Sequence, residues 1–315
     1  MIHWTDPDAV VISTLAIVLA VVGGARSTWS PCGISMLSTI TPMAERGRGH
    51  RWSATATWYL AGSVAGGATL GAALGLAATG IHALANTVTT SAVVAAAVAL
   101  VAAAAEAGVV PLPIHHRQVN ERWLDAYRPW VYATGFGWQI GTGVATYIKT
   151  SAVYVLIALA ALSGNPLLAL AAGILFGLVR GLAVYASRGI TSMSALASFH
   201  RRFMELDRPA RATVVVVELA AATVLSWLAA PWLAAAVVLV SAVVLAARTA
   251  TRPAPWSRRS RNGHRHHEPK NQSKNQNQSE NPNPGQGLIQ TGRPVPAEPV
   301  ALVTSPGGSR TARTA

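Results

Sequence analysis

The sequence predicts an all-α membrane protein, a polytopic helical bundle of six or seven transmembrane helices. Of its 315 residues, 51% are hydrophobic and only 12% are charged, which is unlike a soluble domain. The hydrophobic residues are gathered in blocks of about 20 or more, the length that a helix needs to cross the hydrocarbon layer. Inside that layer a helix satisfies its own backbone groups, which an open strand does not.

Six apolar segments follow one another, and the first and fourth are longer than one crossing needs. The segments are about 9–41, 53–79, 91–106, 131–162, 166–187 and 214–247. Pro31 is expected to break the first segment, because proline removes a helical hydrogen bond. A glycine-rich break is expected after Trp138 in the fourth segment.

The last segment, 214–247, is too long for one ordinary helix. Pro231 stands at its middle between Trp227 and Trp232, and tryptophan favours the membrane interface. We expect two short helices that meet here at an outer turn, which gives seven crossings. One long tilted helix, which gives six crossings, is the alternative.

Lys or Arg residues are present in every second link between these segments and absent from the others. Arginines occur in the links 45–52, 107–130 and 188–213, whereas the links 80–90 and 163–165 contain neither Lys nor Arg. Cytoplasmic loops carry the excess of positive charge, so we expect a multi-pass protein of the cell (plasma) membrane with its N-terminus outside. The arginines that begin at Arg248 place the C-terminal tail in the cytoplasm, which requires an odd number of crossings.

Residues 1–247 are expected to form the transmembrane domain, and residues 248–315 a basic, polar and disordered tail. The tail holds eleven Lys or Arg residues and three Glu, so +8 of the net charge of +13 lies in it. Its stretch 271–287 is almost entirely Asn, Gln, Ser, Pro and Gly, which bury too little apolar surface to fold. The expected partners are membrane lipids, with anionic headgroups of the inner leaflet against residues 248–265, and no nucleic acid.

The first and fourth segments resemble each other. Both are long, glycine-rich and marked by a tryptophan, and Trp29-Ser-Pro-Cys-Gly lines up with Trp138-Gln-Ile-Gly-Thr-Gly. If each unit contains three crossings, the two units enter the membrane from opposite sides. The sequence therefore predicts two inverted three-helix repeats with broken first and fourth helices, an arrangement of many carriers whose sites lie where the broken helices meet.

The segment 24–42 contains Ser30-Pro31-Cys32-Gly33 and a further proline, Pro42, and is similar to the first membrane helix of the CcdA/DsbD family. The resemblance covers about residues 9–230. It implies a thiol–disulfide electron carrier of cytochrome c biogenesis that has two membrane cysteines and accepts electrons from thioredoxin-like proteins. Cys32 matches one of these cysteines and is the only cysteine of the chain, while the second position falls near Gly141 or Thr142. Because release of a mixed disulfide needs a second thiol, the resemblance implies a redox-degenerate member.

Ionisable residues within or near apolar segments are further candidates, because charges are costly in lipid and usually face the bundle interior or water. They are Arg26, Lys149, Arg180 and Glu218. Arg180 and Glu218 are both expected near the cytoplasmic side, where they are placed to pair. Lys149 follows the break of the fourth segment, where it offers a charge to an anion or to the Cys32 thiol, or extends to the interface.

Glycines in the second segment repeat at four- and five-residue spacing, which lets helix backbones approach closely in lipid. They are Gly62, Gly66, Gly67, Gly71 and Gly75. We interpret this row as a packing surface, and a wall of a substrate path is the alternative. No cofactor or metal is expected, because the histidines at 115–116 and 264–267 lack further ligands at suitable spacing and no phosphate-binding loop is present.

Three functions fit these features. The first is the thiol–disulfide carrier, redox-degenerate, with Cys32 as the candidate thiol and Pro31 as the helix break. The second is a small-solute transporter of related inverted-repeat architecture. Its substrate-path candidates are Lys149, Gly141, Thr142, Arg180 and Glu218. The third is a non-catalytic membrane assembly protein, and only the first of the three would be an enzyme.

Overall fold

Helices make up the regular structure of the chain in the computed structural model, which describes residues 7–83, 88–111, 127–145 and 148–250. In chain order they are α1 (Pro7–Ser27), α2 (Pro31–Thr39), α3 (Pro42–Gly47), α4 (Trp52–Ala83), α5 (Val88–Ala107), α7 (Pro129–Gly141), α8 (Ala152–Leu162), α9 (Pro166–Leu182), the 3-10 helix η1 (Ala183–Gly189), α10 (Met193–Glu205), α11 (Asp207–Ala229) and α12 (Pro231–Ala250). These described residues contain no β-strand, so the all-α prediction is confirmed for them. They belong to one packed unit, and the predicted tail lies outside them from residue 251 onward.

Several helices are long and apolar enough to cross a membrane. Within the described residues there are five such stretches, Asp8–Ser27, Trp52–Ile81, Thr89–Ala107, Pro166–Gly189 and Met193–Ala229. Ala152–Leu162 and Pro231–Val243 are apolar as well, but shorter. The chain is therefore a membrane protein, and the count of six or seven crossings stays a prediction.

Proline begins helices in this chain, because its missing N–H has no partner to lose in the first turn. The helices α2, α9 and α12 start at Pro31, Pro166 and Pro231. Two of these starts are also capped. The hydroxyl of Ser30 accepts the Gly33 N–H at 3.2 Å, and the amide oxygen of Asn165 accepts two N–H groups at 3.1 Å. The first and last apolar segments are consequently divided, the first at residues 28–30 and the last at Ala230.

The fourth apolar segment also contains two helices, α7 and α8, and the described residues between them, 142–145 and 148–151, are not helical. Broken helices thus occur in both of the places that the sequence comparison of the two segments indicated. The relation of the two halves as inverted repeats stays a prediction.

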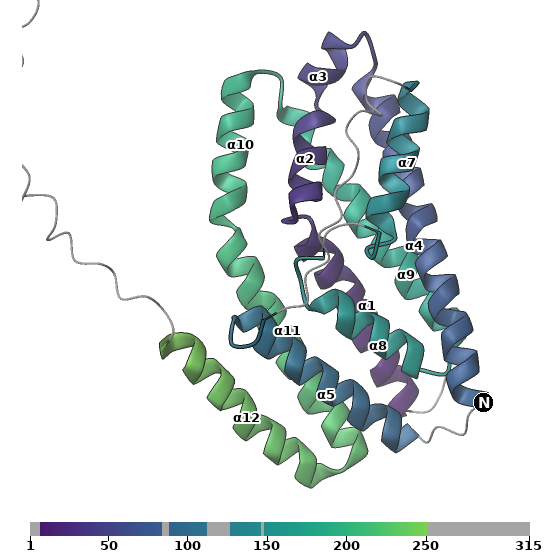
Figure 1. Ribbon diagram of the computed structural model, residues 1–315, viewed down its shortest axis with the longest axis vertical. Helices are drawn as coiled ribbons and strands as arrows, with labels where there is room; N and C mark the ends of the chain where they lie inside the picture. The colour runs from purple at the N-terminus through teal and green to yellow at the C-terminus, as the bar shows by residue number, and fades with distance from the viewer. Residues whose placement is uncertain (1–6, 84–87, 112–126, 146–147, 251–315) are drawn as a thin grey trace, which may run out of the picture. The chain divides into compact units, whose positions relative to one another are not determined.

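Glycines bring α4 against two neighbours at backbone distance (Figure 1). A Cβ atom built at Gly62 would lie 2.2 Å from the carbonyl oxygen of Thr134 in α7, and one at Gly67 would lie 2.3 Å from that of Gly173 in α9. Side chains larger than hydrogen are excluded on both faces, because the obstructing atoms are backbone. The packing interpretation of the glycine row is confirmed.

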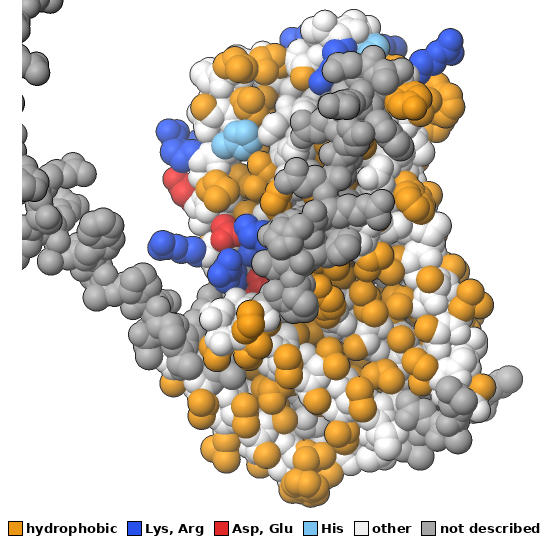
Figure 2. Space-filling model, viewed as in Figure 1, with side chains coloured by type: hydrophobic (Ala, Val, Ile, Leu, Met, Phe, Trp, Pro, Cys, Tyr) orange, Lys and Arg blue, Asp and Glu red, His pale blue; other side chains and the backbone are white. Residues whose placement is uncertain are grey.

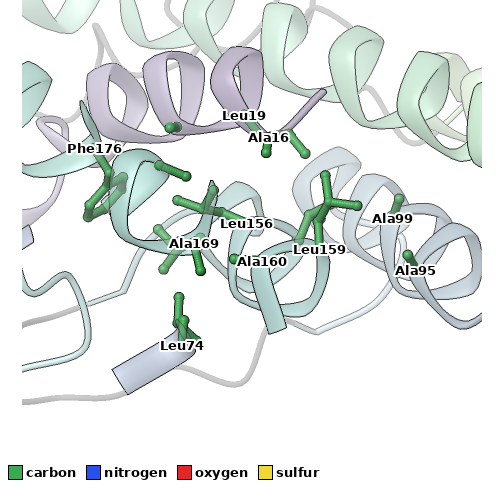
Figure 3. Close-up of a cluster of buried hydrophobic side chains, with 14 of the residues drawn as sticks. Ala16, Leu19, Leu74, Ala95, Ala99, Leu156, Leu159, Ala160, Ala169 and Phe176 are labelled. Atoms are coloured by element: carbon green, nitrogen blue, oxygen red, sulfur yellow. The ribbon is translucent and has the colours of Figure 1, made fainter. Parts of the chain in front are cut away.

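The largest core is built from small and branched side chains. Figure 3 shows residues of α1, α4, α5, α8 and α9 pointing toward one another, among them Leu19, Leu156, Leu159 and Phe176. Alanines such as Ala16 are fully buried members of this core. Small residues permit this approach, which provides dispersion contacts even where lipid supplies no hydrophobic driving force.

On the visible face of the described residues, charged side chains are absent from one part, although hydrophobic side chains occur on both parts (Figure 2). In Figure 2 the lower part of the visible face carries hydrophobic side chains, and the Lys, Arg, Asp and Glu side chains lie above it. Trp232, Leu239 and Val243 of α12 are exposed hydrophobic residues of this kind. A broad apolar surface of this sort is suited to contact with lipid.

Candidate functional site

The interruption between α1 and α2 is a compact turn whose backbone groups are satisfied. The N–H groups of Thr28, Trp29 and Ser30 each donate to a carbonyl three residues earlier, at 3.1 Å. Gly33 is required just after the turn, because a Cβ there would lie 2.3 Å from the carbonyl oxygen of Thr28. The turn therefore places the end of α1 and the start of α2 inside the protein without exposing backbone to lipid.

The indole ring of Trp29 ties the turn to α10. Its Nε1–H donates to the carbonyl oxygen of Phe203 at 2.8 Å, and the two rings stack with centroids 4.5 Å apart. Further along, the hydroxyl of Ser38 in α2 lies 2.9 Å from Nε2 of His200 in α10. The described residues of α10 are not buried, and these contacts link that helix to the turn and to α2.

Charged side chains meet at the end of α1, in a cluster that we name the Arg26 centre. Its members are Arg26, Glu106, Lys149, Ser151, Asp207 and Glu218, which come from α1, α5, α11 and the segment before α8. Arg26 is almost fully buried, and its Nε lies 3.2 Å from Oε1 of Glu106. One terminal nitrogen of Arg26 also lies 3.1 Å from Oδ1 of Asp207.

Ser151 joins the two glutamates of the Arg26 centre. Its backbone N–H donates to Oε2 of Glu106 at 3.0 Å, and its hydroxyl oxygen lies 3.1 Å from the same atom. The hydroxyl oxygen also lies 2.7 Å from Oε1 of Glu218. Both glutamates and Ser151 are buried, so in this apolar surrounding each contact carries more energy than it would in water.

Lys149 lies at the more open edge of the Arg26 centre. Its ammonium group donates to the carbonyl oxygen of Trp29 at 3.3 Å and lies 4.0 Å from Oδ1 of Asp207. The side chain of Lys149 is 32% exposed, whereas that of Arg26 is 1% exposed. Lys149 is therefore the cation of this centre that an incoming anion or partner would reach first.

Arg180 lines a small cavity beside the start of α2, which we name the Arg180 cavity. The cavity has a volume of about 10 Å³, room for about one water molecule. It is lined by Thr28, Gly33, Met36, Leu37, Tyr59, Ile140, Arg180, Ala183 and Val184. Arg180 donates to the carbonyl oxygen of Ile140, and its guanidinium lies 5.6 Å from the ring centre of Phe176.

Cys32 is buried in the first turn of α2, close enough to Arg180 and Tyr59 for electrostatic interaction. Of the alternatives that the sequence left open for Lys149, the contacts seen for its ammonium group are with Trp29 and Asp207. The distribution of cations follows from the fold. Lys149 belongs to the segment before α8, and Arg180 belongs to α9.

The expected ion pair between Arg180 and Glu218 is not among the ion pairs of the described residues, so that expectation is wrong. Arg180 bonds to a backbone carbonyl of α7, and Glu218 bonds to Ser151. The cause is that α9 packs against α4 and α1, whereas α11 packs against α5. Glu218 therefore faces Glu106 rather than the arginine.

Gly141 and Thr142, expected near a substrate path, lie at the interface of α7 with α4. A Cβ at Gly141 would be 2.0 Å from the carbonyl oxygen of Ser63, so this position is filled by the neighbouring backbone. Thr142 is 7% exposed, and its hydroxyl donates to the carbonyl oxygen of Gln139 at 2.8 Å. Both residues take part in helix packing here.

Three members of the Arg26 centre escaped the sequence analysis: Glu106, Ser151 and Asp207. Glu106 ends the third apolar segment, and an acidic residue at that place is a visible signal. Ser151 and Asp207 give none, because a serine before a helix and an aspartate in a polar link are ordinary. Within residues 7–83, 88–111, 127–145 and 148–250 no group of three His, Cys, Asp or Glu side chains is placed to hold a metal ion. The histidines at 115–116 and 264–267 lie outside these residues.

A second buried carboxylate, Glu45 in α3, was also missed. Its oxygens accept from the Thr55 hydroxyl at 2.7 Å, from Arg48 at 2.8 Å and from the Tyr132 hydroxyl at 2.9 Å. All of these partners donate, so the carboxylate charge is well satisfied. Through these hydrogen bonds Glu45 links α3 to α4 and α7.

Comparison with curated proteins finds relatives that share one name, methylamine utilization protein MauF. The relative from Methylobacillus flagellatus is 30% identical over 215 residues, which are 66% of this chain and 76% of that protein. The chain belongs to the MauF family. Relatives from Methylophilus methylotrophus and Paracoccus versutus are 32% and 33% identical, and the chain spans 66% of each.

No family model and no solved structure matches the chain significantly. The relatives are named MauF and not CcdA/DsbD, so the assignment to thiol–disulfide carriers from Ser30-Pro31-Cys32-Gly33 was wrong. The expected thioredoxin-like partner and the link to cytochrome c biogenesis rested on that assignment and lose their support. A physical reason is visible in the fold. A serine cap followed by proline is a general way to restart a helix after a turn, so the motif reports backbone geometry rather than redox chemistry.

Proposed function

We propose that this MauF-family protein acts in methylamine utilization as a membrane-embedded accessory protein. The observation that supports it is the 30% identity to the Methylobacillus flagellatus protein over 76% of that protein's length. The apolar helices agree with it, since they fit a protein that works within the bilayer. An accessory role needs no catalytic group, and among the three functions considered from the sequence it is nearest to the membrane assembly protein.

The proposed functional centre lies around the turn between α1 and α2. Charged residues within a membrane are costly and are usually retained for function. Lys149 and Glu218 belong to the Arg26 centre, and Arg180 lines the Arg180 cavity with Cys32 within electrostatic reach. Pro31 contributes by starting α2 directly after the turn.

The proposed location is the cell (plasma) membrane, with the N-terminus outside and the tail in the cytoplasm. The support is the distribution of arginines among the links between the apolar segments, since they occur only in alternate links. On the visible face the basic side chains lie in the middle and upper parts, whereas the lower part carries hydrophobic side chains without charged ones (Figure 2). Membrane lipids are then the expected neighbours of the hydrophobic surface.

Complementation tests the proposed function. A Paracoccus versutus strain without its own MauF protein would receive this chain, and growth on methylamine would be compared with growth on a carbon source unrelated to methylamine. We expect the chain to restore growth on methylamine, while the empty vector changes neither condition. If full-length chain accumulates in the membrane and growth on methylamine is not restored, the proposal fails.

The same strain tests the proposed centre. Lys149→Gln removes the most exposed cation of the Arg26 centre and is expected to reduce growth on methylamine at unchanged membrane level. Arg208→Gln is the matched control, because Arg208 is an exposed cation with no part in the centre. Equal growth of the two variants would remove Lys149 from the functional centre.

A further inference from the structure

Glu218 is a buried acid whose only hydrogen-bond neighbour among the described residues is Ser151. It is fully buried in α11, and its Oε1 lies 2.7 Å from the Ser151 hydroxyl oxygen. Its other oxygen, Oε2, is buried without a hydrogen-bond partner in the described part of the chain. An ionised carboxylate in such a place would keep one charged oxygen unpaired, which is costly in an apolar surrounding.

The single hydroxyl hydrogen of Ser151 also favours a protonated Glu218. Its hydroxyl has one hydrogen but lies within hydrogen-bond distance of two carboxyl groups, at 2.7 Å from Glu218 and 3.1 Å from Glu106. If both glutamates were ionised, one of these contacts would join two oxygens without a hydrogen between them. A proton on Oε1 of Glu218 removes the conflict. Glu218 then donates to Ser151, and Ser151 donates to Glu106.

The balance of charges in the Arg26 centre independently favours a neutral Glu218. Arg26 and Lys149 supply two positive charges, and Glu106 and Asp207, which contact them, supply two negative charges. A third carboxylate at Glu218 would leave one buried negative charge without compensation. Apart from Glu106, the described residues of α5 and α8 carry no charge. Arg211 interacts electrostatically with Lys149 at the open edge of the centre, but it is half-exposed and lies two turns from Glu218 on α11. A neutral Glu218 balances the centre.

We propose that Glu218 binds one proton as a neutral carboxylic acid, and that Glu218, Ser151 and Glu106 form a proton-binding site inside the membrane bundle. The site takes a proton as its ligand and holds it in a chain of two hydrogen bonds that ends at the carboxylate paired with Arg26. Loss of the proton would leave an uncompensated buried charge, so proton release is coupled to a change in the packing around α11. This inference goes beyond the role in methylamine utilization and does not depend on it.

Infrared spectroscopy of the full chain in nanodiscs at neutral pH tests the proposal, because a protonated carboxyl group has a carbonyl band that an ionised one lacks. We expect such a band in the wild type, with a shift to lower frequency in D₂O, and its loss in Glu218→Gln. Glu45→Gln is the matched control. It removes a buried carboxylate that accepts several hydrogen bonds, so the band should remain. A spectrum of Glu218→Gln identical to the wild type in this region would overturn the proposal.

Thermal unfolding gives a second readout that does not rely on the band. Glutamine has the shape of a protonated glutamate, so Glu218→Gln should keep the melting temperature of the wild type at neutral pH. Glu106→Gln should lower it, because Glu106 is the ionised partner of Arg26. Raising the pH should then destabilise the wild type more than Glu218→Gln. If Glu218→Gln is destabilised as strongly as Glu106→Gln at neutral pH, Glu218 is an ionised partner and the proposal is wrong.

Discussion

Replacing Gly141 by alanine should force α7 away from α4. The Cβ of the alanine would lie 2.0 Å from the carbonyl oxygen of Ser63 and 2.7 Å from its carbonyl carbon. Real Cβ contacts are essentially never closer than 3.0 Å, so the two helices must separate by about 1 Å at this point. Because the obstructing atoms are backbone, no change of side-chain rotamer at Ser63 relieves the clash.

The expected cost follows from two opposing effects. Overpacking of a well-filled interface costs about 1–3 kcal/mol, and a backbone obstruction places this substitution near the upper value. Alanine is the better helix former by about 1 kcal/mol, which offsets part of that cost. We therefore expect Gly141→Ala to lower the free energy of unfolding by about 2 kcal/mol. For a chain of this size that corresponds to a melting temperature lower by roughly 4–8 °C.

The assay is thermal unfolding of purified protein in detergent, followed by tryptophan fluorescence. The matched control is Gly80→Ala in α4, where a Cβ would meet nothing within 4 Å. That control should be as stable as the wild type or slightly more stable, because it gains helix propensity without a clash. If Gly141→Ala melts at the same temperature as Gly80→Ala, the close approach of α4 and α7 at Gly141 is refuted.

Three further predictions concern the Arg26 centre, the turn and the tail. Glu106→Gln should destabilise the protein by about 3 kcal/mol, because Arg26 loses its closest buried carboxylate. Adding Arg26→Met should recover part of this loss when thermal unfolding is measured in the same way. Strictly additive losses from the two substitutions would speak against the ion pair. Pro31→Ala should reduce growth on methylamine in the complemented strain more than Cys32→Ser does, because a continuous helix would replace the turn between α1 and α2. If Cys32→Ser reduces growth more than Pro31→Ala, the thiol has the larger role. A reporter enzyme that is active only outside the cell should be silent when fused after Arg261, and strong activity would mean six crossings.

Hydropathy and proline positions were enough to predict most helices. Blocks of apolar residues locate α4, α5 and α9, because a membrane-spanning helix must be apolar over its whole length. The division of the run 214–247 at Pro231 was predicted for the same local reason, since proline cannot continue a helix without losing a hydrogen bond. The glycine row in α4 was interpreted correctly as a packing surface, because the spacing of small residues on one helix is visible without knowing the partner helix.

The candidate site was predicted only in part. Lys149, Arg180 and Glu218 were identified as unusual charges in apolar surroundings, and the structure buries Arg180 and Glu218. Their partners were not predictable, because Ser151 is 67 residues from Glu218 and Glu106 is 80 residues from Arg26. Arg180 and Glu218 looked like a pair in sequence, yet each bonds to a different group.

The sequence by itself determined that the chain enters a membrane as helices and where most of these helices begin and end, because hydrophobicity, proline and capping residues act within one turn of the backbone. It also determined that ionisable residues lie within or near the apolar segments. Only the tertiary structure decided which charges meet, since that depends on how α1, α5 and α11 pack against each other. Packing selects a partner by distance in space, and two residues such as Ser151 and Glu218 become neighbours only when their helices are already in contact.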